Sequence, residues 1–178
     1  MNTYIALFRG INVGGHHKLP MRELVEILTG LDMHNIETYI QTGNVVFESQ
    51  ETNVALLTDS IPAAIRKSHG FAPSVILLSV AEFEKAIAAN PYPDAVSEPK
   101  TLHLYFLESE PNNPDLEKLE DLKLNNEEFT LVGKVFYLHA PDGIGRSKLA
   151  GQVENALGVA VTARNWRTVE KLMSLANR

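Results

Sequence analysis

Glycines and cations surround a serine in the segment PDGIGRSKL (141–149), a pattern that could hold an anion. Hydrophobic spacing predicts a helix from Ser147 to Leu157, with Arg146 and Lys148 beside its first turn. A helix start already has unpaired N–H groups and a partial positive charge, so a cation there is unfavourable unless an anion is bound. The candidate binding residues are Gly145, Arg146, Ser147 and Lys148. The alternative is a turn at 142–143 and a solvated helix start capped by Ser147.

A second helix start is expected after TARNW (162–166). Asn165 suits the N-cap position, and Arg164 and Arg167 lie on either side of it. Two guanidinium groups could hold a phosphate or a carboxylate with forked hydrogen bonds. Trp166 could stack on a ligand ring, although core packing is the commoner role of a tryptophan. We predict that Arg164, Asn165 and Arg167 bind the same anion; the alternative is that both arginines face water.

The third segment with suitable residues is RGINVGGHHKLP (9–20). Arg9 ends a predicted strand, Gly14 and Gly15 let the backbone approach a ligand, and Lys18 precedes a helix that begins near Pro20. Asn12 could bind the ligand or hydrogen-bond within its own turn. The adjacent residues His16 and His17 point in opposite directions on an extended chain, so no metal site is expected.

A hairpin tip could add amide contacts to this site. Gln41 and Asn44 flank Thr42 and Gly43 between two predicted strands, and ordinary turn chemistry is the alternative role for both side chains. No serine, histidine or carboxylate stands in a recognisable catalytic motif. The sequence therefore leaves open whether the protein is an enzyme, and it identifies no cofactor.

The elements that must position these residues follow a repeated order. Strands are expected at 3–9, 36–41, 44–49 and 73–79, with helices between the first two and the last two, which is the βαββαβ order of ferredoxin-like domains. Pro62 should kink or split the second of these helices. Strands at 101–107, 128–132, 134–140 and 159–162 repeat the order, with helices near 114–122 and 147–157.

The fold class predicted from this order is α+β, with two ferredoxin-like (βαββαβ-type) halves packed together and an extra C-terminal helix over 166–176. One continuous mixed sheet is the alternative. The segment 91–100 contains three prolines and no periodicity, and it is the predicted linker between an N-terminal half (1–90) and a C-terminal half (101–178). The two halves could also behave as a single domain.

Composition excludes several classes of protein. The 178 residues carry a net charge of −6, so binding to nucleic acid by overall charge is not expected. There is no cysteine, which excludes disulfides and thiolate metal sites and fits a cytoplasmic location. No apolar run is long enough for a membrane span.

Four motifs in order resemble one known family. They are RGINVGG (9–15), YIQTGNVVFES (39–49), PDGIGRSKL (141–149) and TARNWRTV (162–169). Together they closely resemble the family of domain of unknown function 1697, whose members look like compact bacterial α+β proteins. The resemblance implies that these loops belong together, and it supplies no activity, cofactor or catalytic residue.

The function predicted from the residues is binding of a small anion, such as a nucleotide or a phosphorylated metabolite. Six of the sixteen Lys and Arg residues lie in the three segments 9–20, 141–149 and 162–169. One alternative is RNA binding, because ferredoxin-like sheets can stack bases on aromatic side chains, but the motif of that class is absent. Another is an interaction protein whose glycine loops are only turns.

Overall fold

The computed structural model describes residues 1–178 and has an α+β fold with two four-stranded antiparallel sheets. Contacts divide the chain into one unit of Met1–Lys85 with Lys171–Arg178, and a second unit of Ala86–Glu170. The predicted α+β class with two βαββαβ-type halves is confirmed, and the alternative of one continuous mixed sheet is wrong. The division into 1–90, 91–100 and 101–178 stays a prediction.

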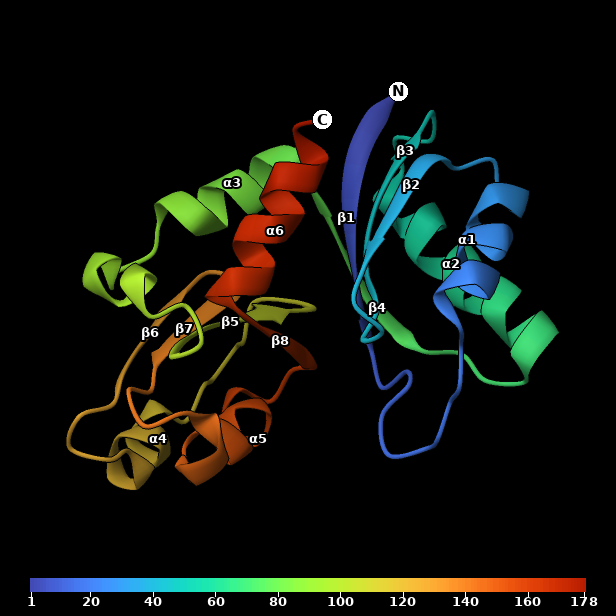
Figure 1. Cartoon of the computed structure of the whole chain (residues 1–178). Helices are drawn as coiled ribbons and strands as arrows, with labels where there is room; N and C mark the ends of the chain where they lie inside the picture. The colour runs from blue at the N-terminus through green and yellow to red at the C-terminus, as the bar shows by residue number, and fades with distance from the viewer. The chain divides into compact units, whose positions relative to one another are not determined.

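The first unit contains one sheet covered on one face by two helices (Figure 1). Its sheet order is β2-β3-β1-β4. Its elements are β1 (Asn2–Arg9), α1 (Met21–Gly30), β2 (His34–Tyr39), β3 (Asn44–Ser49), α2 (Val54–His69) and β4 (Ser74–Ser79). Alternate residues of β1 point towards the covered face. Tyr4, Ala6 and Phe8 therefore pack with Leu24 and Leu28 of α1 in one core cluster.

Of the two effects predicted for Pro62, a kink or a split, the split is wrong, because α2 continues through the proline. Asn53 caps its start by accepting hydrogen bonds from Ala55 N and Leu56 N, and Gly70 ends it in the left-handed conformation. Buried residues on both sides of the proline, Ile61 and Ile65, anchor the two segments to the same core. This burial offsets the loss of one backbone hydrogen bond at the proline.

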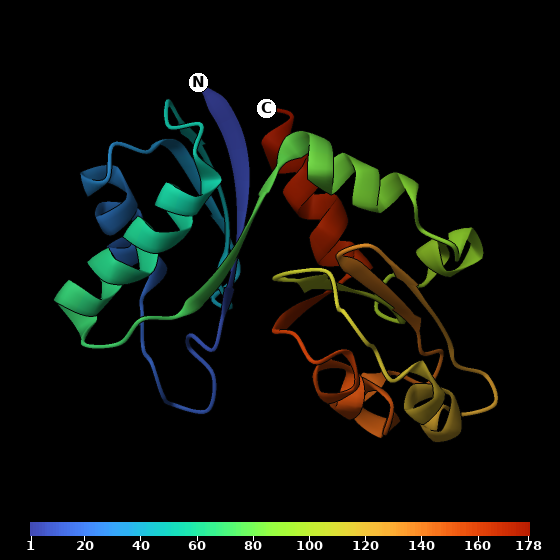
Figure 2. The same ribbon diagram turned by 180° about the vertical axis from the view of Figure 1, so that it is seen from behind.

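The second unit repeats the element order of the first, with the sheet order β6-β7-β5-β8. Its strands are β5 (Leu102–Leu107), β6 (Glu128–Val132), β7 (Val135–His139) and β8 (Val161–Asn165), and its helices α4 (Leu116–Leu122) and α5 (Val153–Leu157) lie together beside the sheet (Figure 2). Leu119 of α4 and Val153 of α5 share a core cluster with Tyr105 and Phe136. Asp115 caps α4 by accepting a hydrogen bond from Lys118 N.

A helix follows the fourth strand of each half. Helix α3 (Val80–Ala88) follows β4, and α6 (Trp166–Ala176) follows β8. A capping box begins α3, where Ser79 N donates to Glu82 Oε2 at 2.8 Å and Glu82 N donates to Ser79 Oγ at 3.2 Å. The short 3-10 helix η1 (Pro93–Ser97) then leads into the second half.

Candidate functional site

The glycines of the first loop form a two-residue turn. Val13 and His16 form an isolated β-bridge, and His16 N donates to Val13 O at 3.2 Å. Gly14 and Gly15, with φ of +62° and +75°, occupy the two central positions, which require left-handed conformations in a turn of this kind. The loop is therefore a small exposed hairpin held in one shape.

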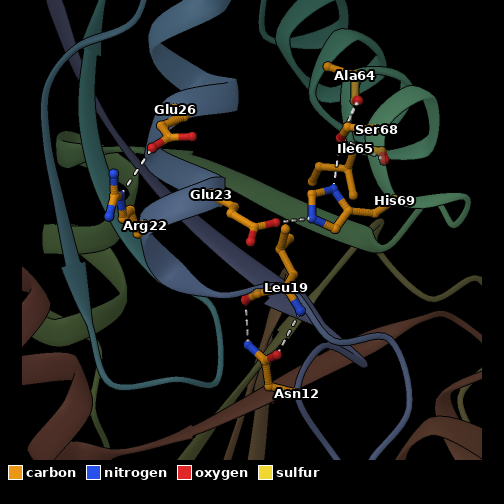
Figure 3. Close-up of polar contacts among 9 residues, drawn as sticks. All are labelled: Asn12, Leu19, Arg22, Glu23, Glu26, Ala64, Ile65, Ser68 and His69. Atoms are coloured by element: carbon orange, nitrogen blue, oxygen red, sulfur yellow. Dashed lines mark hydrogen bonds and ion pairs between the residues drawn. The ribbon is translucent and has the colours of Figure 1, made fainter.

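Asn12 joins this hairpin to the rest of the unit. Its Nδ2 donates to Leu19 O and its Oδ1 accepts from Leu19 N, both at 2.8 Å (Figure 3). The same Nδ2 also donates to Gln41 O at 2.8 Å. The contact with Gln41 brings the β1–α1 loop against the β2–β3 loop. The amide group of Asn12 is thus engaged within the protein, which is the alternative role considered for it from the sequence.

The β2–β3 loop is equally constrained. Asn44 is fully buried, and its Nδ2 donates to Tyr39 O at 3.1 Å and to Thr42 Oγ1 at 3.3 Å. Gly43 has a φ of +83°, and a Cβ atom there would lie 2.6 Å from Phe8 Cβ. Ile40 is 51% exposed and has a φ of +52°, a genuine outlier for a β-branched residue. The loop holds this strained, exposed conformation.

We call residues 9–20 and 39–44 the basic loop pair. Arg9, His16, His17 and Lys18 are all exposed, and neither loop contains an aspartate or a glutamate. The ring of His17 stacks on Phe71 with the ring centroids 4.5 Å apart and the planes at 12°. The basic loop pair is therefore a positively charged surface on a chain whose net charge is −6.

The second cationic segment does not begin a helix. A short 3-10 turn, Ile144–Arg146, precedes Ser147, and α5 begins only at Val153. Ser147 is buried, and its Oγ accepts from Ala150 N at 3.0 Å, which favours a turn at this point. The predicted helix start at Ser147 is wrong, so Arg146 and the exposed Lys148 lie in turns that precede the helix. Gly145 is part of the same 3-10 turn.

Helix α6 begins where the sequence predicts. Asn165 Oδ1 accepts from Thr168 N at 3.0 Å, which confirms the predicted N-cap, and Arg167 is exposed in the first turn. Trp166 is only 5% exposed, and its Nε1 has no hydrogen-bond partner. The indole is thus a buried side chain, as tryptophan most often is.

Arg164 lies in β8, before the helix, where it is partly buried. Its Nη1 donates to Thr162 Oγ1 at 3.0 Å and to Ala163 O at 2.8 Å. Burial lowers the pKa of Arg164 to about 10. The guanidinium remains protonated at neutral pH, and its orientation is fixed by these contacts.

Sequence reasoning missed a hydrogen-bonded chain between the two helices of the first unit. His69 Nε2 lies 2.6 Å from Glu23 Oε2, and Ser68 Oγ lies 2.8 Å from His69 Nδ1 (Figure 3). Ser68 Oγ also lies 3.2 Å from the carbonyl oxygens of Ala64 and Ile65. Because Ser68 is the last-turn residue of a helix and bonds to that helix, the chain fastens α2 to α1. Glu23 and His69 are 46 residues apart in sequence, so no local pattern reveals their contact.

Two buried polar atoms in the second unit lack hydrogen-bond partners in addition to the indole nitrogen. They are His103 Nδ1 and Glu127 Oε1. Burial lowers the pKa of His103, although a backbone hydrogen bond with Thr101 opposes the shift. Burial, together with the charge of Glu127, raises the pKa of Tyr105 to about 12. The imidazole and the phenol are therefore neutral at physiological pH.

No group of three or more histidine, aspartate and glutamate side chains is arranged to hold a metal ion. None of the helices combines the length and the apolar character needed to span a membrane.

A family model described as a protein of unknown function (DUF1697) matches residues 1–137. The chain belongs to this family. The match includes the whole basic loop pair, whereas the segments 141–149 and 162–169 lie beyond its end.

A solved structure has the same fold as this family member. It is the structure of the conserved bacterial protein SP0830 from Streptococcus pneumoniae, which is 25% identical in sequence and superposes with a TM-score of 0.73. The alignment covers 98% of each chain, so the architecture is shared from end to end. No curated protein matches the chain.

Proposed function

We propose that this protein binds a small anionic ligand, a nucleotide or another phosphorylated metabolite, at the basic loop pair. The observation that carries the proposal is the junction made by Asn12, which fastens the cationic loop 9–20 to the uncharged loop 39–44, with no acidic residue in either. On an acidic chain, a local positive surface attracts anions that the rest of the molecule repels.

The backbone of the basic loop pair supports the same ligand class. Asn12, Gly14, Gly15 and His17 have positive φ values. The N–H of Asn12 donates to His17 O at 3.1 Å, so the backbone N–H groups that could turn towards an anion are those of the two glycines. Lys18 forms no ion pair and would supply a point charge, while Arg9 could form forked hydrogen bonds to a phosphate. The hydrogen bonds of Asn12 and Asn44 reduce the entropy lost when the loops hold a ligand.

The second unit supplies further candidate cations. Arg146 and Lys148 are exposed beside the buried Ser147 in the 141–149 loop. We propose that Gly145 and these residues contact anions, with Arg164 held in place by its own hydrogen bonds. That all the cationic segments share one pocket stays a prediction, as does a cytoplasmic location.

Burial of the strand aromatics argues against the alternative of RNA binding on a sheet face. Seven of the nine aromatic residues in the strands are at most 5% exposed, so they present no surface on which bases could stack. The seven buried rings are those of Tyr4, Phe8, Phe47, Tyr105, Phe106, Phe136 and Tyr137. Tyr39 and Phe129 are partly exposed, which leaves one such ring on each sheet.

A thermal-shift screen of inorganic phosphate, nucleotides, sugar phosphates and carboxylates tests the proposal. A ligand at 100 times its Kd stabilises the folded state by about 2.7 kcal/mol, which raises Tm measurably. We expect the double variant Arg9→Gln and Lys18→Gln to lose the shift. The matched control is Arg66→Gln with Lys67→Gln, which removes the same charge from exposed positions at the end of α2.

Two results would overturn the proposal. One is that no anion in the screen raises the Tm of the unmodified protein. The other is that the loop variant keeps the full shift of the unmodified protein, as the control variant should.

A further inference from the structure

A surface hollow of about 510 Å³ lies in the second unit where β5 and α6 begin. Its lining residues are Glu98, Pro99, Lys100, Thr101, Arg167 and Glu170. The pairing of His103 in β5 with Asn165 in β8 places these two element starts side by side. The volume lies within the range of small-molecule sites, and the hollow shares no residue with the basic loop pair.

The charges that line the hollow sum to zero and are not paired with one another. Lys100 and Arg167 are cations, Glu98 and Glu170 are carboxylates, and none of the four side chains forms an ion pair or a hydrogen bond. Arg167 and Glu170 are three residues apart on one helix, a spacing at which opposite charges commonly pair. Both signs of charge are therefore available to a ligand.

The backbone around the hollow is fixed by hydrogen bonds. Thr101 N and Thr101 Oγ1 donate to Glu98 O at 2.9 and 2.8 Å, and Ala140 N donates to Thr101 O at 2.9 Å. On the other side, the bond from Thr168 N to Asn165 Oδ1 fixes the first turn of α6. The positions from which the four charged side chains project are thus preorganised, which lowers the entropic cost of binding.

We propose that this hollow binds a free α-amino acid in its zwitterionic form. Lys100 and Arg167 receive the α-carboxylate, which the positive end of the α6 dipole also favours. Glu98 and Glu170 receive the α-ammonium group. A simple anion would be repelled by the two glutamates and a simple amine by the two cations, so only a ligand with both charges close together complements the site. A longer peptide separates its terminal charges and does not.

Calorimetric titration of the intact protein with the proteinogenic amino acids tests this site. For each amino acid that binds, the N-acetyl derivative lacks the ammonium group and the amide derivative lacks the carboxylate. We expect both derivatives to bind at least about tenfold more weakly than the parent amino acid, a difference well within the resolution of the measurement.

Two variants with matched controls locate the binding. Arg167→Gln and Glu170→Gln should each weaken binding by about tenfold or more, because each leaves one charge of the ligand uncompensated. Lys134→Gln and Glu117→Gln change the same charges at exposed positions of the same unit outside the hollow, and they should bind as the unmodified protein does.

Three outcomes would overturn the proposal. They are binding of no free amino acid with a Kd below about 10 mM, equal affinity for the N-acetyl or amide derivative, and undiminished binding by both hollow variants. Because the anion screen uses different residues, either proposal can fail while the other holds.

Discussion

Changing Asn12 to aspartate alters one functional group at the junction of the basic loop pair. The two side chains have nearly the same size and shape, and the aspartate keeps an oxygen to accept from Leu19 N. Its other oxygen replaces the amide nitrogen that now donates to Leu19 O and Gln41 O at 2.8 Å. In the variant, a carboxylate oxygen faces two carbonyl oxygens that also carry partial negative charge.

The expected cost of Asn12→Asp at pH 7 is about 2–4 kcal/mol in the free energy of unfolding. Two donated hydrogen bonds are lost at about 1 kcal/mol each, and repulsion between the carboxylate and the carbonyls adds to this loss. For a chain of this size, Tm should fall by roughly 5–15 °C. Asn113→Asp is the control, because Asn113 is exposed and forms no side-chain hydrogen bond.

Urea unfolding at pH 7 and at pH 4 distinguishes this explanation from a general effect of charge. The unfolded aspartate has a pKa of about 3.9, and the two carbonyls raise the pKa of the folded carboxyl above that value. Near these pKa values the folded variant therefore binds more protons than the unfolded chain. The free energy of unfolding of the variant, relative to that of the unmodified protein, is highest at low pH and falls as pH rises through the folded pKa.

Two backbone variants complete the series. Both Asn12→Gly and Asn12→Ala remove all three side-chain hydrogen bonds, but the φ of +55° suits glycine and strains alanine. Alanine should therefore be the less stable of the two by about 1 kcal/mol. The reasoning would be refuted if Asn12→Asp unfolded within about 0.5 kcal/mol of the unmodified protein at pH 7, well below the loss of one hydrogen bond. A deficit of the same size at both pH values would refute it as well.

Three further predictions concern buried positions. Gly43→Ala should reduce the free energy of unfolding in urea by about 2–4 kcal/mol, since the new Cβ would lie 2.6 Å from Phe8 Cβ at a φ of +83°; an unchanged midpoint would contradict the packing described. Tyr137→Phe should cost about 1–2 kcal/mol, because Tyr137 Oη donates to Ala86 O at 2.6 Å and that buried carbonyl would lose its partner; the same titration checks it. Burial lowers the pKa of His103, so the folded protein resists its protonation and stability should decline as pH falls below about 6.5, the unfolded value. His103→Gln should make the plot of Tm against pH flatter between pH 7.5 and 5.5, and an unaltered plot would count against a buried neutral imidazole.

Periodic patterns in the sequence were sufficient to locate most of the elements. The strands Asn44–Ser49 and Glu128–Val132 and the helix Trp166–Ala176 have the predicted bounds. In each case the alternation or the helical spacing of apolar residues agrees with the turn or capping residues at the ends, so local preferences and core packing favour the same structure.

The positions where prediction failed depend on contacts between distant residues. Continuation of α2 through Pro62 depends on burial of Ile61 and Ile65 against a sheet, which outweighs the local preference. The expected helix at Ser147 is replaced by turns because its hydroxyl accepts from Ala150 N and the residue is buried. Local spacing predicts which face of a helix is apolar, but it does not predict how the next segment packs.

For the candidate site residues too, local sequence predicts some roles, and others depend on contacts between distant residues. The capping role of Asn165 follows from its type and position, whereas the bond from Asn12 to Gln41 O requires two loops to meet whose bonded residues are 29 positions apart in sequence. Likewise, the lining of the hollow by Glu98 and Arg167 follows from strand pairing and from no motif.

The recurrence of one element order in both halves offers a route to redesign. The connection between β1 and α1 is the basic hairpin 10–20, whereas its counterpart between β5 and α4, residues 108–115, contains three acidic side chains and no cation. The equivalent connections in the two halves therefore carry opposite charge. Residues 10–20 could be grafted in place of residues 108–115, with a hydrogen-bond partner for Asn12 supplied by the β6–β7 turn. The second half would then carry a copy of the basic hairpin at the equivalent position.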